Sequence, residues 1–166
     1  MPVYEQELSE LYVLPGESHL VYQPTAIRTL LGSCVGVTFL CSRLRIGALC
    51  HPMLPRAPKI PEHVKPNLAD MRRYVDFTLR DLIQQFDQLG AHRPEIEVKL
   101  FGGADVLIVN NPAESRPTVG RMNLEMAVKV LREEGLRIAA SCVGGNTGYH
   151  IKFFTDTGEV ILRRLR

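Results

Sequence analysis

The chain has 166 residues, which suits one domain and is long enough to bury roughly 70% of its unfolded surface on folding. Hydrophobic residues make up 45% of the chain and charged residues 23%, values typical of globular proteins, so the composition excludes a disordered chain. The net charge of +2 does not indicate a nucleic-acid-binding surface, and no apolar run approaches the length of a membrane helix.

The first twenty residues contain several acidic residues and no basic one, a pattern that is wrong for a secretory signal. The four cysteines, at positions 34, 41, 50 and 142, form no C-x-x-C pair. Such spacing argues against a zinc site or a dithiol, and we expect no metal and no cofactor. We therefore expect a single domain over residues 1–166, located in the cytoplasm and holding free thiols.

Short strands separated by turn residues are expected from residue 11 to residue 49. Residues 35–39 alternate apolar with small or polar side chains, as a strand does, and Cys34 stands at the start of this strand. The next strand ends at His51. If the two strands are antiparallel and joined at Ser42 and Arg43, Cys34 and His51 lie near the same end of the sheet.

Five prolines between residues 52 and 66 predict an irregular surface loop. One amphipathic helix is then expected, with Asn67 as its cap and Gly90 at its end. Its apolar residues recur at intervals of three and four: Leu68, Met71, Val75, Leu79, Leu82, Ile83, Phe86 and Leu89.

A strand over residues 96–101 leads into Gly102 and Gly103, followed by an irregular segment through residue 117. A second helix is expected to begin near the cap candidate Asn123 and to end at Gly135. After it come a strand over residues 138–143 and a hairpin over residues 149–165.

Two long helices cannot cover both faces of a sheet of about seven strands. The expected fold is therefore α+β, a layered sandwich of mixed or antiparallel sheet with the two main helices packed on one face.

Cys34 follows a corner of small residues, Gly32 and Ser33, at the mouth of a strand. A glycine there lets the backbone turn tightly and leaves the thiol and nearby N–H groups accessible, which suits a nucleophile beside an oxyanion hole. A thiol needs a base in reach, and His51 is the candidate. The alternative from the residues alone is a buried cysteine and a loop histidine without catalytic roles.

The segments LLGSCVGV at 30–37 and GALCHPMLP at 47–55 resemble the two signature regions of CheD, the chemoreceptor glutamine deamidase family. Further segments match the family's pattern in the same order: KLFGGA at 99–104, VGRMN at 119–123, GGNTGY at 144–149 and DTGEVILRRL at 156–165. The resemblance covers most of the chain from about residue 25 onward.

This resemblance implies a cysteine-dependent hydrolase, a protein-glutamine glutaminase that converts selected glutamines of a chemoreceptor's cytoplasmic domain to glutamates. It leaves open a second activity on receptor glutamyl methyl esters. The family's nucleophile falls on Cys34 and its histidine on His51. From the corner itself we expect the backbone of Gly32 and Ser33 to form the oxyanion site, with N–H groups near Ser33 and Cys34 holding the oxyanion. A CheC-type phosphatase is the implied protein partner, whereas neither nucleic acid nor insertion into a membrane is expected.

The family's third catalytic residue is a threonine just ahead of LGSC. Thr29 is the candidate, but a shift of one residue would place Arg28 there. A guanidinium has no acceptor for an imidazole N–H, so Thr29 is the interpretation we adopt.

Two other functions stay open at this point. The chain could be a regulatory binding partner of the CheC phosphatase with weak or no catalysis, or a redox sensor that uses the Cys34 thiol. If His51 is not the base, His150 is the alternative histidine. We also expect His51, at the end of a strand, to be only partly buried.

Overall fold

The computed structural model describes residues 7–106 and 116–166. Residues 107–115, part of the irregular segment expected before the second helix, lie outside these ranges. Within them the elements are, in chain order, β1 (Ser9–Tyr12), β2 (Ser18–Val21), β3 (Thr25–Leu31), β4 (Val35–Cys41), β5 (Ile46–Cys50), α1 (Leu68–Met71), α2 (Val75–Gln88), a short 3-10 turn (Arg93–Glu95), β6 (Glu97–Gly102), α3 (Val119–Glu133), β7 (Ile138–Val143), β8 (Tyr149–Phe154) and β9 (Val160–Arg164).

The described strands form two sheets. One has four strands in the order β1-β3-β8-β9, and the other has five in the order β2-β5-β4-β6-β7. Most neighbours are antiparallel, but β1 pairs with β3 and β6 with β7 in parallel. The expected mixed sheet is therefore confirmed, as are the antiparallel pairing of β4 with β5 and that of β8 with β9.

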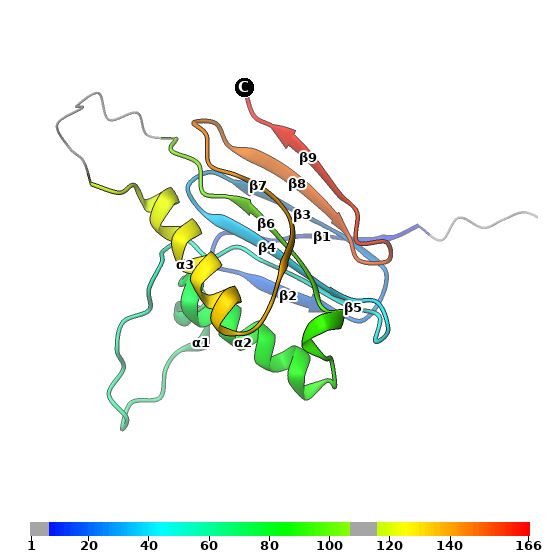
Figure 1. The fold of residues 1–166 in the computed structure, drawn as a ribbon, viewed down its shortest axis with the longest axis horizontal. Helices are drawn as coiled ribbons and strands as arrows, with labels where there is room; N and C mark the ends of the chain where they lie inside the picture. Colours follow the sequence, from blue (N-terminus) through cyan, green and yellow to red (C-terminus); the bar gives the residue numbers. More distant parts are fainter. Residues whose placement is uncertain (1–6, 107–115) are drawn as a thin grey trace, which may run out of the picture.

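The fold has three layers with an apolar core between each pair of neighbouring layers. Strand β4 contributes side chains to both cores. Val37 and Phe39 point into a core shared with α2 and α3, whereas Leu40 points into a core shared with the four-stranded sheet. This alternation follows from the two-residue period of a strand. The helices thus cover one face of the five-stranded sheet and the second sheet covers the other, as Figure 1 shows. The α+β class with two main helices on one face is confirmed.

The first predicted helix is two helices. The apolar stripe continues across both, and Asn67 caps α1 as expected, but the backbone is extended at Tyr74. The N–H groups of Met53 and Leu54 donate to the carbonyl of Arg73, and Val75 N–H donates to Leu54 O. The loop after β5 therefore forms hydrogen bonds with the backbone between α1 and α2 and interrupts the helix there. The prediction of one continuous helix was wrong.

The second helix begins earlier than predicted. Thr118, not Asn123, caps α3, because its Oγ1 accepts a hydrogen bond from the N–H of Arg121. Asn123 lies inside the helix and is fully buried.

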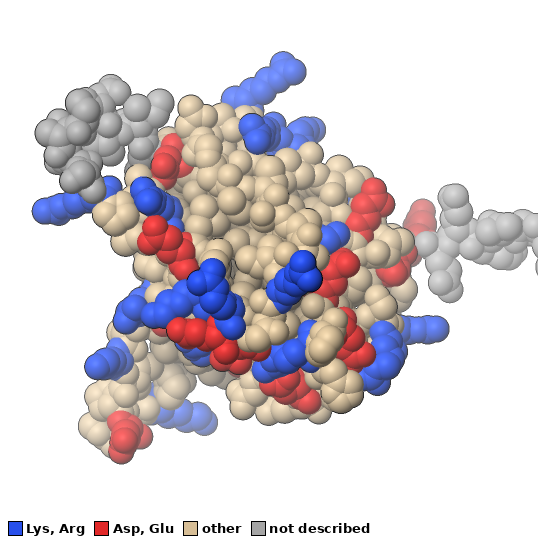
Figure 2. All heavy atoms as spheres, in the orientation of Figure 1, with Lys and Arg blue, Asp and Glu red and all other residues tan. Residues whose placement is uncertain are grey.

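Charged side chains of both signs gather over the helical layer in Figure 2. Several of them join α2 and the turn after it to the end of α3: Arg80 with Glu133 and Glu134, and Arg93 with Asp87 and Glu134. Pairs this exposed contribute little stability individually. No helix in the described part of the chain has the length and apolar character needed to cross a membrane.

Candidate functional site

The corner that carries Cys34 is held by three consecutive carbonyl groups. The carbonyl of Gly32 accepts a hydrogen bond from Ala104 N–H at 2.9 Å, and that of Cys34 accepts one from Gly103 N–H at 2.9 Å. Between them, the carbonyl of Ser33 accepts a hydrogen bond from the side-chain amide of Asn123 at 2.9 Å. The corner is therefore fastened to the end of β6 and to α3.

These carbonyls determine where the N–H groups of the corner point. In a trans peptide unit the C=O and the following N–H point in opposite directions. Because the carbonyls of Gly32 and Ser33 point to their donors, the N–H groups of Ser33 and Cys34 point away from those donors. This arrangement leaves two neighbouring N–H groups beside the thiol, as an oxyanion hole requires.

His51 follows β5, and the strand register places it beside Cys34. Val37 pairs with Cys50, and Val35 N–H donates to Pro52 O at 3.4 Å, so His51 continues the register opposite Gly36. Cys34 is then the diagonal neighbour of His51 on the same sheet face, a relation that typically separates Cβ atoms by about 5 to 8 Å. Gly36 has no side chain to stand between them.

Thr29 meets His51 across the sandwich. Its Oγ1 lies 2.7 Å from His51 Nδ1 and 2.7 Å from the carbonyl oxygen of Val13. A hydroxyl has one hydrogen, and a carbonyl can only accept, so that hydrogen goes to Val13. The ring of His51 must therefore donate from Nδ1, which leaves Nε2 as its basic atom.

Strand alternation settles which residue of β3 faces the histidine. Thr29 is fully buried between the sheets, whereas the neighbouring Arg28 points outward and pairs with Glu10 at 3.1 Å. Of the two candidates for the third position, the structure brings Thr29 to His51 and takes Arg28 away from it.

His51 is only 1% exposed, so the expectation of a partly buried loop histidine was wrong. The backbone of His51 is hydrogen-bonded to the segment between β1 and β2. His51 N–H donates to Glu17 O, and His51 O accepts from Gly16 N–H. Burial lowers the pKa of His51 from 6.5 to about 4, and burial also raises the pKa of the half-buried Cys34 thiol above 9.0. The resting pair is thus a neutral imidazole and a protonated thiol.

The remaining histidine and cysteine candidates lie elsewhere. His150 is on the outward face of β8, paired in register with Leu30 and Arg163, and so does not face Thr29. Cys41 and Cys50 are fully buried in the core between sheet and helices, as packed thiols are. Among the described residues, no group of three or more histidine, cysteine, aspartate or glutamate residues is arranged to hold a metal ion.

Asn123 is the site residue that sequence reasoning missed. It was predicted to cap the second helix. Its side chain instead extends from α3 and donates to the carbonyls of Ser33 and Met53. The signal was present, because Thr118 is itself a good cap residue. With the helix begun there, Asn123 falls on the same face as Ala127, a face expected to be apolar.

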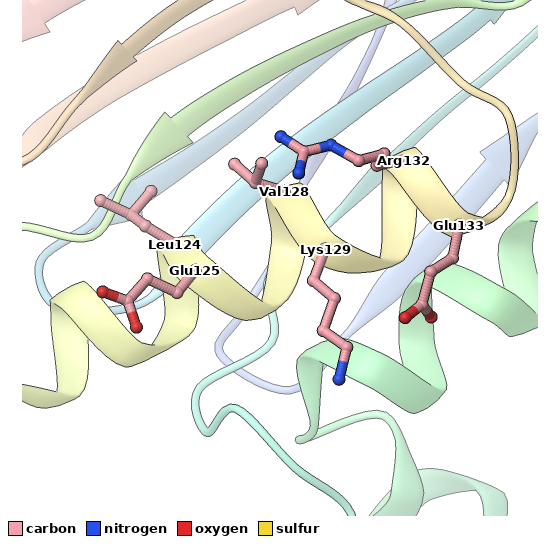
Figure 3. Close-up of a pocket in the computed structure, with 6 residues that line it drawn as sticks. All are labelled: Leu124, Glu125, Val128, Lys129, Arg132 and Glu133. Carbon is pink, nitrogen blue, oxygen red and sulfur yellow. The ribbon is translucent and has the colours of Figure 1, made fainter.

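A surface hollow runs along α3, lined by the six residues drawn in Figure 3: Leu124, Glu125, Val128, Lys129, Arg132 and Glu133. Leu124 and Val128 pack against the helix–sheet core, and the other four are charged. None of them belongs to the Cys34 corner or contacts His51 by a hydrogen bond, so we place the chemistry at the hydrogen-bonded residues rather than in this hollow.

Comparisons with known proteins agree with the sequence motifs. A family model described as "CheD chemotactic sensory transduction" matches residues 53–164. A Geobacter sulfurreducens protein named "Probable chemoreceptor glutamine deamidase CheD 2" is 40% identical over 99% of this chain and 96% of its own length. Proteins named "Probable chemoreceptor glutamine deamidase CheD" are 34% identical in Maridesulfovibrio salexigens, over 99% of this chain and 97% of their own, and 36% identical in Thermococcus kodakarensis, over 81% and 80%.

Proposed function

Because the chain belongs to the CheD family, we propose that it hydrolyses the side-chain amide of selected glutamines on a chemoreceptor, forming glutamate and ammonia. The observation that carries the proposal is the Thr29–His51 hydrogen bond, which leaves Nε2 basic on the sheet face that Cys34 shares. The names of the relatives supply the substrate class.

In the first half of the reaction, Cys34 Sγ attacks the amide carbon while His51 Nε2 takes the thiol proton. The N–H groups of Ser33 and Cys34 hold the oxyanion that forms. The imidazolium then protonates the nitrogen, the C–N bond breaks, and ammonia leaves a thioester. The imidazolium form is costly in a buried site, and this cost favours prompt return of the proton.

In the second half, His51 Nε2 takes a proton from a water molecule that attacks the thioester carbon. The C–S bond breaks, the proton returns to the sulfur, and glutamate is released. Thr29 keeps the imidazole in one tautomer and orientation throughout. Every step uses protein groups and water, so the scheme requires no cofactor.

The test is ammonia release from a purified receptor cytoplasmic fragment, with mass spectrometry to locate each glutamine that has become glutamate. We expect Cys34→Ala to bind the fragment and release no ammonia. Cys142→Ala is the matched control, because Cys142 is also a partly exposed thiol but lies on β7. Normal turnover by Cys34→Ala would overturn the scheme.

The same thioester chemistry extends to receptor glutamyl methyl esters, with methanol in place of ammonia as the leaving group. A methyl ester places its carbonyl carbon at the same distance from the backbone as the glutamine amide does. Methanol release from a methylated fragment by the parent protein, and not by Cys34→Ala, tests this extension.

A CheC-type phosphatase and action in the cytoplasm remain predictions from the family resemblance. Ammonia release measured with and without a purified phosphatase tests the partnership. If the chain bound the phosphatase and released no ammonia under any condition, a purely regulatory role would replace the proposed one.

A further inference from the structure

The buried side chain of Asn123 joins the two strand ends that carry the proposed catalytic pair. Its Nδ2 donates to Ser33 O at 2.9 Å and to Met53 O at 3.0 Å. Ser33 directly precedes Cys34, and Met53 lies two residues after His51. One amide group thus spans the gap between the nucleophile corner and the loop that follows the histidine.

Stability alone does not account for this side chain. Its Oδ1 is buried and has no hydrogen-bond partner within the described part of the chain. An unpaired buried acceptor costs about 1 to 3 kcal/mol, which offsets the gain from the two bonds made by the amide nitrogen. Both partners are carbonyl oxygens, so the position requires a head group with two donors, which aspartate, serine and leucine lack.

Helix α3 holds the amide at a fixed distance from the corner. A Cβ at Gly120 would stand 2.6 Å from Ala104 O, and one at Gly103 would stand 2.3 Å from Leu124 Cγ. The helix therefore packs directly on the turn at the end of β6. That same turn donates to the carbonyls of Gly32 and Cys34, so α3 and the corner form one packed unit.

The bond to Ser33 has a direct chemical consequence. Ser33 C=O and Cys34 N–H belong to one planar peptide unit. A donor that fixes the carbonyl therefore also fixes the direction of the N–H that is proposed to hold the oxyanion. Removing the donor frees this peptide to rotate and misaligns that N–H.

We propose that Asn123 is a positioning residue: its amide clamps the Cys34 corner to the His51 loop and aims the Cys34 N–H at the oxyanion. The inference rests on the proposed function. It predicts an effect on the transition state more than on substrate binding, because the oxyanion exists only after attack.

The test compares Asn123→Ala and Asn123→Asp with the parent protein in the ammonia-release assay. Asp keeps the shape of Asn but places acceptors against two carbonyls. We expect kcat to fall by about tenfold or more in both variants, toward the loss seen when an oxyanion donor is removed, while KM changes less than about threefold. The control is Thr118→Ala, which removes the cap of the same helix and leaves the amide in place.

Alkylation by iodoacetamide, mapped by mass spectrometry, gives a readout that needs no substrate. We expect the Asn123 variants to change the labelling rate of Cys34 relative to Cys142 and to leave the buried Cys41 and Cys50 unlabelled. Labelling of Cys41 and Cys50 would mean that the variants loosen the whole fold, and would overturn the clamp. A loss of kcat in Thr118→Ala as large as in the Asn123 variants would overturn it as well.

Normal kcat in a folded Asn123 variant would also overturn the clamp while the proposed function stood. A parent protein that released no ammonia would instead overturn the proposed function and the inference with it. If Asn123→Asp does not fold, because it buries a carboxylate against two carbonyl oxygens, Asn123→Ala decides, because it adds no charge to the packed site.

Discussion

Thr29 gives His51 a neutral partner rather than a charged one. A carboxylate at this position would stabilise the imidazolium, whereas a hydroxyl that accepts from Nδ1 fixes the tautomer without supplying charge. With burial lowering the pKa of His51 to about 4, the imidazole becomes charged only during the reaction. In the proposed scheme Thr29 therefore orients the base, and the electrostatic stabilisation of the oxyanion falls to the backbone N–H groups.

Replacing Thr29 by valine tests this role, because valine keeps the shape and removes Oγ1. We expect kcat to fall about fivefold, the equivalent of one lost hydrogen bond of roughly 1 kcal/mol. Thr29→Ser retains the hydroxyl and should keep most of the activity. Loss of activity in Thr29→Ser but not in Thr29→Val would mean that the methyl group, not the hydroxyl, matters here.

The pH dependence of kcat/KM should be a broad bell. The active form pairs neutral His51 with the Cys34 thiol, and burial moves their pKa values in opposite directions. The acidic limb should lie well below the ordinary histidine value, so activity should hold down to about pH 5, and the alkaline limb should lie above the ordinary value of a thiol. His51→Gln should lower kcat about 10²-fold or more at every pH. An acidic limb near pH 6.5 in the parent would contradict a buried, neutral base.

Strand β3 shows how far the sequence determines the site. The motifs pointed to Cys34 and His51 as candidates, and the antiparallel pair β4–β5 was predicted from alternation and the turn between the strands. The position of the third residue depends on which face of β3 turns inward. A shift of one residue reverses the faces, and only packing against β8 and β5 determines it.

The helix boundaries were harder to predict, because the competing interactions come from distant parts of the chain. The break before α2 is made by Leu54, about twenty residues upstream of Tyr74, and leaves the apolar period unchanged. Asn123 is a good cap residue by type, so local preference favoured it as a helix start. Its actual partners, Ser33 and Met53, are 90 and 70 residues away.

Gly120 provides a test of how closely α3 packs. Replacing a helical glycine by alanine ordinarily stabilises a helix by roughly 0.5 to 1 kcal/mol. Here the new Cβ would lie 2.6 Å from Ala104 O and 2.7 Å from Gly103 O, both backbone atoms that cannot move aside cheaply. We therefore expect Gly120→Ala to lower the free energy of unfolding by about 1 to 3 kcal/mol and to reduce activity.

Urea unfolding measures this change, and Gly135→Ala is the comparison. Gly135 ends α3 with a φ of +71° and has nothing within 4 Å of a new Cβ. It should lose only about 1 to 2 kcal/mol from backbone strain and keep full activity. A Gly120→Ala protein more stable than the parent would show that α3 does not press on the β6 turn.

At the scale of the whole molecule, the site lies where the two sheets meet. Thr29 comes from the four-stranded sheet and Asn123 from the helical layer, while Cys34 precedes β4 and His51 follows β5 of the five-stranded sheet. The arrangement of these residues therefore depends on all three layers staying packed. Loss of the core between the sheets would separate Thr29 from His51 before any strand unfolds.

This architecture makes the stability of the fold depend on pH through His51. The unfolded chain binds a proton at the ordinary pKa of 6.5, whereas the folded chain binds it only at about 4. As pH falls through this window the unfolded state gains protons first, so stability decreases. At about 1.4 kcal/mol per pKa unit, the full effect is about 3 kcal/mol.

Urea unfolding between pH 7 and pH 4 should show this loss in the parent protein. Other groups titrate in the same direction: burial and nearby cations lower the pKa of His150, and Arg43 lowers the pKa of Glu95 to about 2. The comparison with His51→Gln removes their contribution, since both proteins keep them. We expect the variant to lose less stability than the parent over this window, by an amount approaching 3 kcal/mol. Parallel curves for the two proteins would mean that His51 accepts its proton as readily in the folded chain as in the unfolded one, and the buried neutral base would have to be abandoned.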